Sequence, residues 1–223
     1  MWRSGTAAAI AVVAGLGASA MALALTPLLM PPGYSWLSMT TSESAAQEVD
    51  GAWLARLGFV LFGLSVVLLA VLRRRAWGVA ATALHGAFGL LMLATAIFST
   101  RSWQPGAELD RTEDMLHSVA ATALGFAFAA GVLATALHAR HAGRQRRWWL
   151  DATAVVASVV LPLAMTALPG ADGVLQRAMF ATGYAWYAAE AISGPLGVTK
   201  PRSPAWRAAG AIRRRPPRST VTR

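Results

Sequence analysis

The sequence predicts an all-α fold, a polytopic bundle of six transmembrane helices with both ends of the chain in the cytoplasm. Three observations lead to this prediction. Of the 223 residues, 56% are hydrophobic and only 13% are charged, whereas a soluble domain carries about 25% charged residues. The hydrophobic residues gather in six separate segments. The connectors between these segments are alternately basic and acidic.

Each apolar segment is long enough to cross a membrane, for which about 17 residues is the lower limit. The segments are rich in Ala, Leu and Gly and lack a sustained period of two, so strands are not expected. In chain order, the predicted spans cover about residues 6–30, 53–72, 78–100, 116–139, 152–168 and 175–192. Residues 1–192 are therefore expected to form one transmembrane domain.

Several segments have features of their own. The segment 6–30 follows Arg3 as a secretory signal would, but the apolar part of a signal has roughly 7–15 residues, so we expect a retained span. In the segment 116–139, Ala121, Gly125 and Ala129 repeat every four residues. This spacing predicts a face of small residues where helix backbones approach closely, and it turns His117 towards the bundle.

The orientation follows from the charges. Under the positive-inside rule the basic connectors lie in the cytoplasm, so we expect a multi-pass protein of the inner (plasma) membrane. The basic residues are Arg3, Arg73, Arg74, Arg75, Arg140, Arg144, Arg146, Arg147, Lys200, Arg202, Arg207, Arg213, Arg214, Arg215, Arg218 and Arg223. The acidic residues of the opposite connectors are Glu43, Glu48, Asp50, Glu108, Asp110, Glu113, Asp114 and Asp172.

The net charge of +10 would suggest a nucleic-acid partner in a soluble protein. Here the arginines lie beside apolar segments, so we expect membrane lipid as the partner and no nucleic acid. A second copy of the chain or another membrane protein is an open alternative. The basic tail 193–223 is predicted to be disordered. The absence of cysteine excludes disulfides, thiolate metal sites and cysteine nucleophiles.

The polar loop 99–117 and the first loop, which connects the predicted spans 6–30 and 53–72, suggest a site on the acidic side. Asp114 and His117 are three residues apart and share a helix face, and an acid beside an imidazole suits a metal or an acid–base pair. The structural alternative is that these acids stabilise the helix start, with Thr112 or Asp114 as the N-cap. The candidate catalytic residues are Ser42, Asp114 and His117; the candidate metal ligands are Asp114 and His117; and the candidate ligand-binding residues are Glu43, Asp110, Asp114, His117 and His85.

His85 lies roughly 11 Å inside the predicted span 78–100, and an ionisable group at that depth is a hypothesis for function. The alternative is a neutral histidine that is hydrogen-bonded to a neighbouring helix. The same helical rise puts His138, its only plausible partner for clamping a haem, at a height that differs by roughly 10 Å. We therefore predict no cofactor.

Three runs of residues resemble a bacterial membrane family known as domain of unknown function 998. They are S-W-L-S-M-T-T-S-E-S at 35–44, W-L-A-R-L-G-F-V-L-F-G-L at 53–64 and D-M-L-H-S-V-A-A at 114–121. The resemblance covers about residues 6–192 and implies six spans without an established reaction. Its matching polar positions are Ser38, Ser42, Glu43, Asp114 and His117. A more distant resemblance links the chain to six-span eukaryotic proteins of lipid remodelling and lipid asymmetry.

These observations favour a non-enzymatic function, the binding or movement of a lipid or other hydrophobic small molecule. One alternative is an intramembrane lipid hydrolase that uses Ser42, Asp114 and His117. Another is an accessory subunit that packs against a second membrane protein.

Overall fold

The computed structural model describes residues 2–193 of the chain, and the predicted tail lies outside them apart from Ser193. The described part is all-helical and contains no strand. Its helices are α1 (Trp2–Leu25), the short η1 (Thr26–Leu29) and η2 (Glu43–Ala45), α2 (Ala52–Ile97), α3 (Arg111–His141), α4 (Trp148–Ala167) and α5 (Asp172–Ile192).

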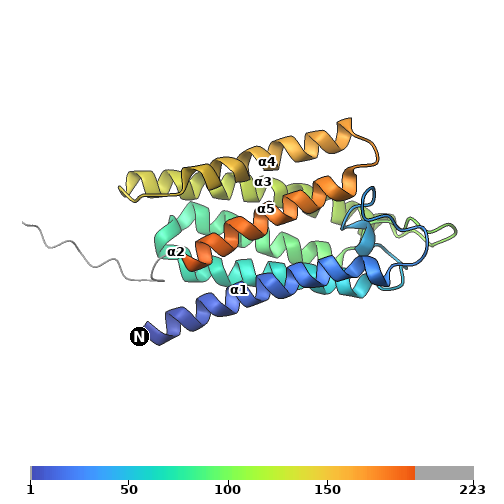
Figure 1. Cartoon of the computed structure of the whole chain (residues 1–223), viewed down its shortest axis with the longest axis horizontal. Helices are drawn as coiled ribbons and strands as arrows, with labels where there is room; N and C mark the ends of the chain where they lie inside the picture. Colours follow the sequence, from blue (N-terminus) through green and yellow to red (C-terminus); the bar gives the residue numbers. More distant parts are fainter. Residues whose placement is uncertain (1, 194–223) are drawn as a thin grey trace, which may run out of the picture.

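Helix α2 folds back on itself at Gly78 (Figure 1). In a straight helix, Phe62 and Phe88 would be about 39 Å apart, yet their ring centroids are separated by 5.5 Å. The two arms, 52–77 and 79–97, approach closely where Gly63 meets Gly89. A Cβ atom on either glycine would lie 2.7 or 2.8 Å from the carbonyl oxygen of the other. The element α2 is therefore a pair of antiparallel helices.

Gly78 makes this reversal possible. Its φ of 78° and ψ of 172° belong to a region that is essentially restricted to glycine. A Cβ atom there would also lie 2.7 Å from Nδ1 of His138 in α3. Both the backbone and its surroundings thus require glycine at this position.

Four helical segments are long and apolar enough to cross a membrane. They are Thr6–Leu29, Ala52–Ile97, Arg111–His141 and Trp148–Ala167. Helix α5 is not among them, and it carries Asp172, Gln176, Arg177 and Glu190.

The basic and acidic connectors lie at opposite ends of the bundle (Figure 1). The N-terminus, the turn at Gly78, the α3–α4 connector and the end of α5 lie together, at what we call the basic end. The loops 30–51, 98–110 and 168–171 lie at the other end, which we call the acidic end. The predicted alternation of connectors thus corresponds to a physical separation.

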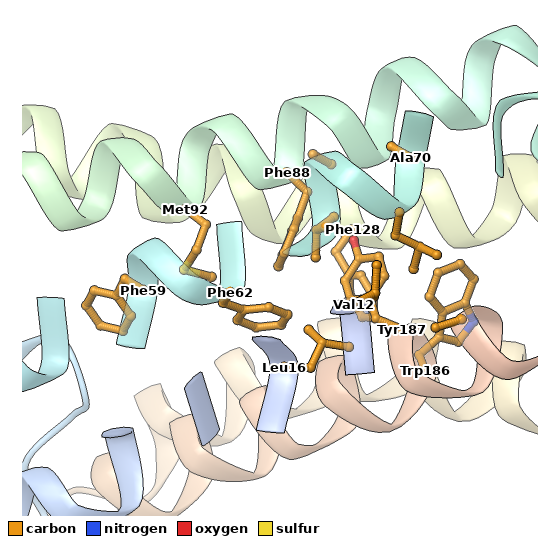
Figure 2. Packing of buried hydrophobic residues seen from close by; sticks show 14 of the residues in the cluster. Val12, Leu16, Phe59, Phe62, Ala70, Phe88, Met92, Phe128, Trp186 and Tyr187 are labelled. Carbon is orange, nitrogen blue, oxygen red and sulfur yellow. The ribbon is translucent and has the colours of Figure 1, made fainter. Parts of the chain in front are cut away.

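The core is rich in aromatic rings contributed by α2, α3 and α5. Phe62, Phe88, Phe128, Trp186 and Tyr187 meet there, with fully buried aliphatic residues of α1 beside them (Figure 2). The ring centroids of Tyr187 lie 5.2–6.0 Å from those of its four aromatic neighbours in this set, distances typical of favourable aromatic pairs. Helix α4 is peripheral, since only two of its residues are buried.

Helices α3, α4 and α5, like α1, begin three or more residues earlier than their apolar segments predict. Helix α3 begins at Arg111, α4 at Trp148 and α5 at Asp172. The first turn of α3 is polar, and the first turns of α4 and α5 each contain one acid, Asp151 and Asp172. Hydropathy places the starts of α3, α4 and α5 too late in the sequence, because an acid stabilises the first turn of a helix but is not counted as part of an apolar segment.

Candidate functional site

In the first loop, Glu43 and Ser42 are used for local structure. The carboxylate of Glu43 accepts hydrogen bonds from the backbone N–H of Thr40 at 2.6 Å and from its hydroxyl at 2.8 Å. The backbone N–H groups of Thr41 and Ser42 donate to Oε1 of Gln176 in α5, at 2.7 and 3.3 Å. These bonds tie the loop to itself and to α5.

Asp110 and Asp114 stabilise the start of α3. Oδ1 of Asp110 accepts from the backbone N–H groups of Thr112 at 2.8 Å and Glu113 at 3.0 Å. Asp110 is therefore the N-cap, and the prediction of Thr112 or Asp114 as the cap was wrong. Oδ1 of Asp114 accepts from the Thr100 hydroxyl at 3.0 Å and from the backbone N–H of Arg101 at 2.8 Å. Asp114 thus holds the loop 98–110 onto α3.

His117 points into the bundle, as its spacing predicts, and is only 3% exposed. Its Nδ1 donates to the carbonyl oxygen of Phe98 at 2.8 Å, which makes Nε2 of the neutral ring an acceptor. Among the described residues this buried Nε2 has no partner. Neither Ser42 nor Asp114 is hydrogen-bonded to the His117 ring.

The described residues include no group of three or more His, Asp or Glu side chains that could hold a metal ion. The metal hypothesis therefore has two candidate ligands, Asp114 and His117, and no third one nearby.

Other side chains lock the acidic end together. Gln47 donates to the carbonyl oxygens of Ser99 and Asp110, both at 3.0 Å, and accepts from the Asp110 N–H at 3.0 Å. Arg56 donates to two carbonyl oxygens of the first loop. Arg177 donates to the carbonyl oxygens of Trp36, Met39 and Gly173 and to the Tyr34 hydroxyl. Polar side chains here serve mainly to hold backbone in place.

His85 is fully buried and both of its nitrogens are used. Nδ1 lies 3.0 Å from the Tyr187 hydroxyl, and Nε2 lies 3.2 Å from Oγ1 of Thr135. The hydroxyl proton of Thr135 goes to the carbonyl oxygen of Gly131, so we assign the Nε2 proton to the bond with Thr135. Tyr187 then donates to Nδ1. This geometry fits the neutral, hydrogen-bonded histidine and leaves no nitrogen free to bind iron.

An apolar pocket of about 450 Å³ lies between the second arm of α2 and helices α3, α4 and α5. Its lining includes Phe88, Met92, Phe128, Pro162 and Phe180, together with the small residues Ala121, Gly125 and Ala129. A Cβ atom on Gly125 would meet nothing within 4 Å. The prediction that this stripe brings helix backbones together was wrong at Gly125, because there the stripe faces open space.

A polar network fills the basic end. Arg146 donates to Asp151 through two hydrogen bonds of 2.7 and 2.8 Å and lies 3.1 Å from Oε1 of Glu190. The indole N–H groups of Trp186 and Trp77 donate to Asp151 at 2.9 Å and Glu190 at 2.8 Å, respectively. Burial acts to lower the pKa of Arg146, but the hydrogen bond to Asp151 and the charge of Glu190 raise it above its ordinary value.

The sequence predicts part of this network. Glu190 lies near the end of the predicted span 175–192, where it is expected either to pair with an arginine of a connector or to carry a proton. Its ion pair with Arg146 confirms the pairing. Asp151 was missed, although a signal was present. It is an acid in a basic connector and hence an exception to the alternation of charges.

A pocket of about 370 Å³ opens beside this network. Arg73, Arg144, Arg146 and Arg147 line it, together with both carboxylates. Its charged lining is mainly basic, with four arginines against two carboxylates.

Comparison with known proteins adds the family. No curated protein and no solved structure matches the chain. A family model described as "Protein of unknown function (DUF998)" matches residues 12–193, which includes every element described above except the start of α1. The chain therefore belongs to the DUF998 family.

Proposed function

We propose that this protein is a six-span membrane protein that binds or moves a lipid or another hydrophobic small molecule, and that the apolar pocket between α2, α3, α4 and α5 is where the molecule binds. The observation that carries the proposal is the pocket itself. Its volume of about 450 Å³ is within the range of about 300–1,000 Å³ of small-molecule sites.

The six spans are supported by the reversal in α2. The arm 79–97 would measure about 28 Å and α5 about 31 Å, close to the roughly 30 Å of a bilayer core, and the arm 52–77, at about 39 Å, exceeds it. Large apolar side chains also lie on the outer surface, such as Val79 at 88% exposed and Phe126 at 74%. Such a surface suits lipid rather than water. The positive-inside rule then favours a cytoplasmic basic end, with both termini inside.

The lining of the pocket favours an apolar ligand. Phenylalanine, methionine and small aliphatic side chains dominate it, and the polar side chains are hydroxyl groups, those of Thr122, Ser158 and Thr182. The hydroxyls of Ser158 and Thr182 already donate to carbonyl oxygens of their own helices. A hydrocarbon chain therefore fits this lining better than a charged or strongly polar molecule does.

The test is to fill the pocket and measure bound lipid. Gly125→Leu places a side chain in the open space, whereas Gly86→Leu is a matched control. Gly86 is also inside a helix with nothing within 4 Å of its Cβ position, but it does not line the pocket. We expect Gly125→Leu to reduce photo-crosslinking to a lipid with a diazirine-bearing acyl chain by about tenfold, and Gly86→Leu to leave it unchanged. Equal labelling of wild type and Gly125→Leu would refute the proposal.

One observation favours the alternative of a lipid hydrolase at the acidic end. The buried Nε2 of His117 has no partner in the described part of the chain. A general base needs such a free nitrogen to accept a proton when the substrate binds. Hydrolysis of a short-chain lipid ester by the wild type, abolished in His117→Asn, would establish this function in place of binding alone.

A further inference from the structure

The pocket at the basic end is built from distant parts of the chain. Arg73 belongs to the first arm of α2. Arg144, Arg146 and Arg147 belong to the α3–α4 connector, and Arg147 directly precedes α4. The last turn of α5 adds Glu190 and the first turn of α4 adds Asp151. The fold thus brings four guanidinium groups and two carboxylates around one hollow.

The two carboxylates are both taken by Arg146. Among the described residues, the two ion pairs found are those of Arg146 with Asp151 and with Glu190. Arg73 donates to the carbonyl oxygens of Glu190 and Ser193, and Arg144 to that of Ala76. These carbonyl oxygens bear no charge, so the pocket keeps an excess of positive charge.

Two guanidinium groups also have donors to spare. Arg73 is only 6% exposed, and within the described residues its Nε is buried without a partner, as is the Nε of Arg144. Native proteins rarely leave buried donors unsatisfied, and an unpaired donor on a charged group is especially unfavourable. These two Nε donors therefore lack an acceptor among the described residues.

We propose that this pocket binds a phosphate group, either on the headgroup of an anionic phospholipid or on a soluble phosphate compound. Guanidinium groups present planar pairs of donors that match the oxygens of phosphate, and a tetrahedral anion accepts hydrogen bonds from several directions at once. Helix α4 adds to the attraction. It begins beside the pocket without a side-chain cap, and the start of a helix carries partial positive charge.

This phosphate site is separate from the apolar pocket and does not depend on the function proposed for it. The test uses the full chain, with Arg144→Gln and Arg73→Gln as variants. Arg140→Gln is the matched control, because Arg140 is an exposed arginine of the same connector region that does not line the pocket. The basic tail is present in all of them, so its own attraction to anions cancels in the comparison.

The experiment has two arms. In the first, protein in a neutral detergent is titrated with inorganic phosphate, and binding is followed by calorimetry. In the second, the protein is placed in nanodiscs of phosphatidylcholine with or without phosphatidylglycerol, and the retained lipid is identified by native mass spectrometry. We expect Arg144→Gln to weaken binding about tenfold, the scale of one charge-assisted hydrogen bond, while Arg140→Gln binds like the wild type.

The outcomes distinguish the two sources. Weakened phosphate binding in the first arm supports a soluble ligand, and weakened retention of phosphatidylglycerol alone supports a headgroup. The proposal is overturned if neither arm shows binding by the wild type, or if Arg140→Gln weakens binding as much as Arg144→Gln. If Arg73→Gln fails to fold, Arg144→Gln alone decides the question.

Discussion

The two ends of the bundle use their charged residues in different ways. At the acidic end, the carboxylates of Glu43 and Asp114 accept hydrogen bonds from loop backbone and hydroxyl groups, and that of Asp110 accepts from the first turn of α3. Gln47 bridges two loops. At the basic end, Arg146 pairs with both carboxylates, and the guanidinium groups of Arg73 and Arg144 keep unpaired donors among the described residues. Among the described residues, the acidic end leaves unpaired only uncharged buried groups, Nε2 of His117 and the hydroxyls of Thr41 and Ser99, whereas the basic end leaves the Nε donors of two arginines unpaired.

This difference shows that a gathering of acids and histidine is weaker evidence for a site than an account of their hydrogen bonds. The acidic loops attract attention in the sequence because polar residues stand out between apolar segments. Once their partners are known, most of these side chains have a structural role. Among the described residues, the unpaired donors that belong to charged groups lie on arginines that the sequence explains by topology alone.

The largest effect on this comparison is expected from Arg146→Ala. The change leaves Asp151 and Glu190 largely buried without their cation, and removing one partner from a buried ion pair costs about 3 kcal/mol. Unfolding of the purified protein in detergent should show this loss, with Arg140→Ala as the exposed control. If Arg146→Ala lost no more stability than Arg140→Ala, the network at the basic end would not be a structural unit.

A smaller loss is expected from Gln47→Ala at the acidic end. Gln47 is 6% exposed, and its removal leaves the buried carbonyl oxygen of Ser99 and the partly buried backbone groups of Asp110 without this partner, at a cost of about 2 kcal/mol. Gln104→Ala, in the loop 98–110, is the control, because Gln104 takes no part in the hydrogen bonds of Gln47 to Ser99 and Asp110. Phosphate binding at the basic end should not change in Gln47→Ala; if it did, the two ends would not be independent.

Asp110→Ala should reduce stability by about 1 kcal/mol, because it removes the N-cap of α3. Asp110→Asn keeps an acceptor oxygen and should stay within a few tenths of a kcal/mol of the wild type. The pair is best compared by thermal unfolding. Equal losses in both variants would show that the negative charge, rather than the cap, is what matters.

The smallest effect is expected from His117→Asn, which keeps a donor for the Phe98 carbonyl oxygen and removes Nε2. If the acidic end is structural, stability changes by less than about 1 kcal/mol and the metal content of the purified protein stays the same. Stoichiometric metal in the wild type that is lost in His117→Asn would break the comparison and make the acidic end a metal site.

The sequence allowed most of the helices to be predicted, because apolar length and charge alternation are local properties. Each predicted apolar segment overlaps a helix or an arm of α2. The starts of α3, α4 and α5 were predicted too late because their first turns carry polar groups. A connector was expected at residues 73–77, directly before the actual break at Gly78, and hydropathy gives no sign that one residue suffices to reverse the chain.

The contacts at the two ends were harder to predict. The pairing of Glu190 with a connector arginine followed from its position near the end of a segment. The role of Asp151 did not, since it depends on Arg146 and Trp186 meeting in space. For the same reason, the stripe at Gly125 was taken for a packing face, because small residues alone do not reveal that α4 lies far enough away to leave a pocket.

The reversal at Gly78 bears on how the protein enters the membrane during synthesis. Because Gly78 alone joins the arms of α2, one arm cannot be inserted far from the other. We therefore expect both arms to leave the translocation machinery together as a hairpin. Arg73, Arg74 and Arg75 directly precede the tip, and positive charges resist translocation. A single glycine beside three arginines would then set the order of assembly for the middle of the bundle.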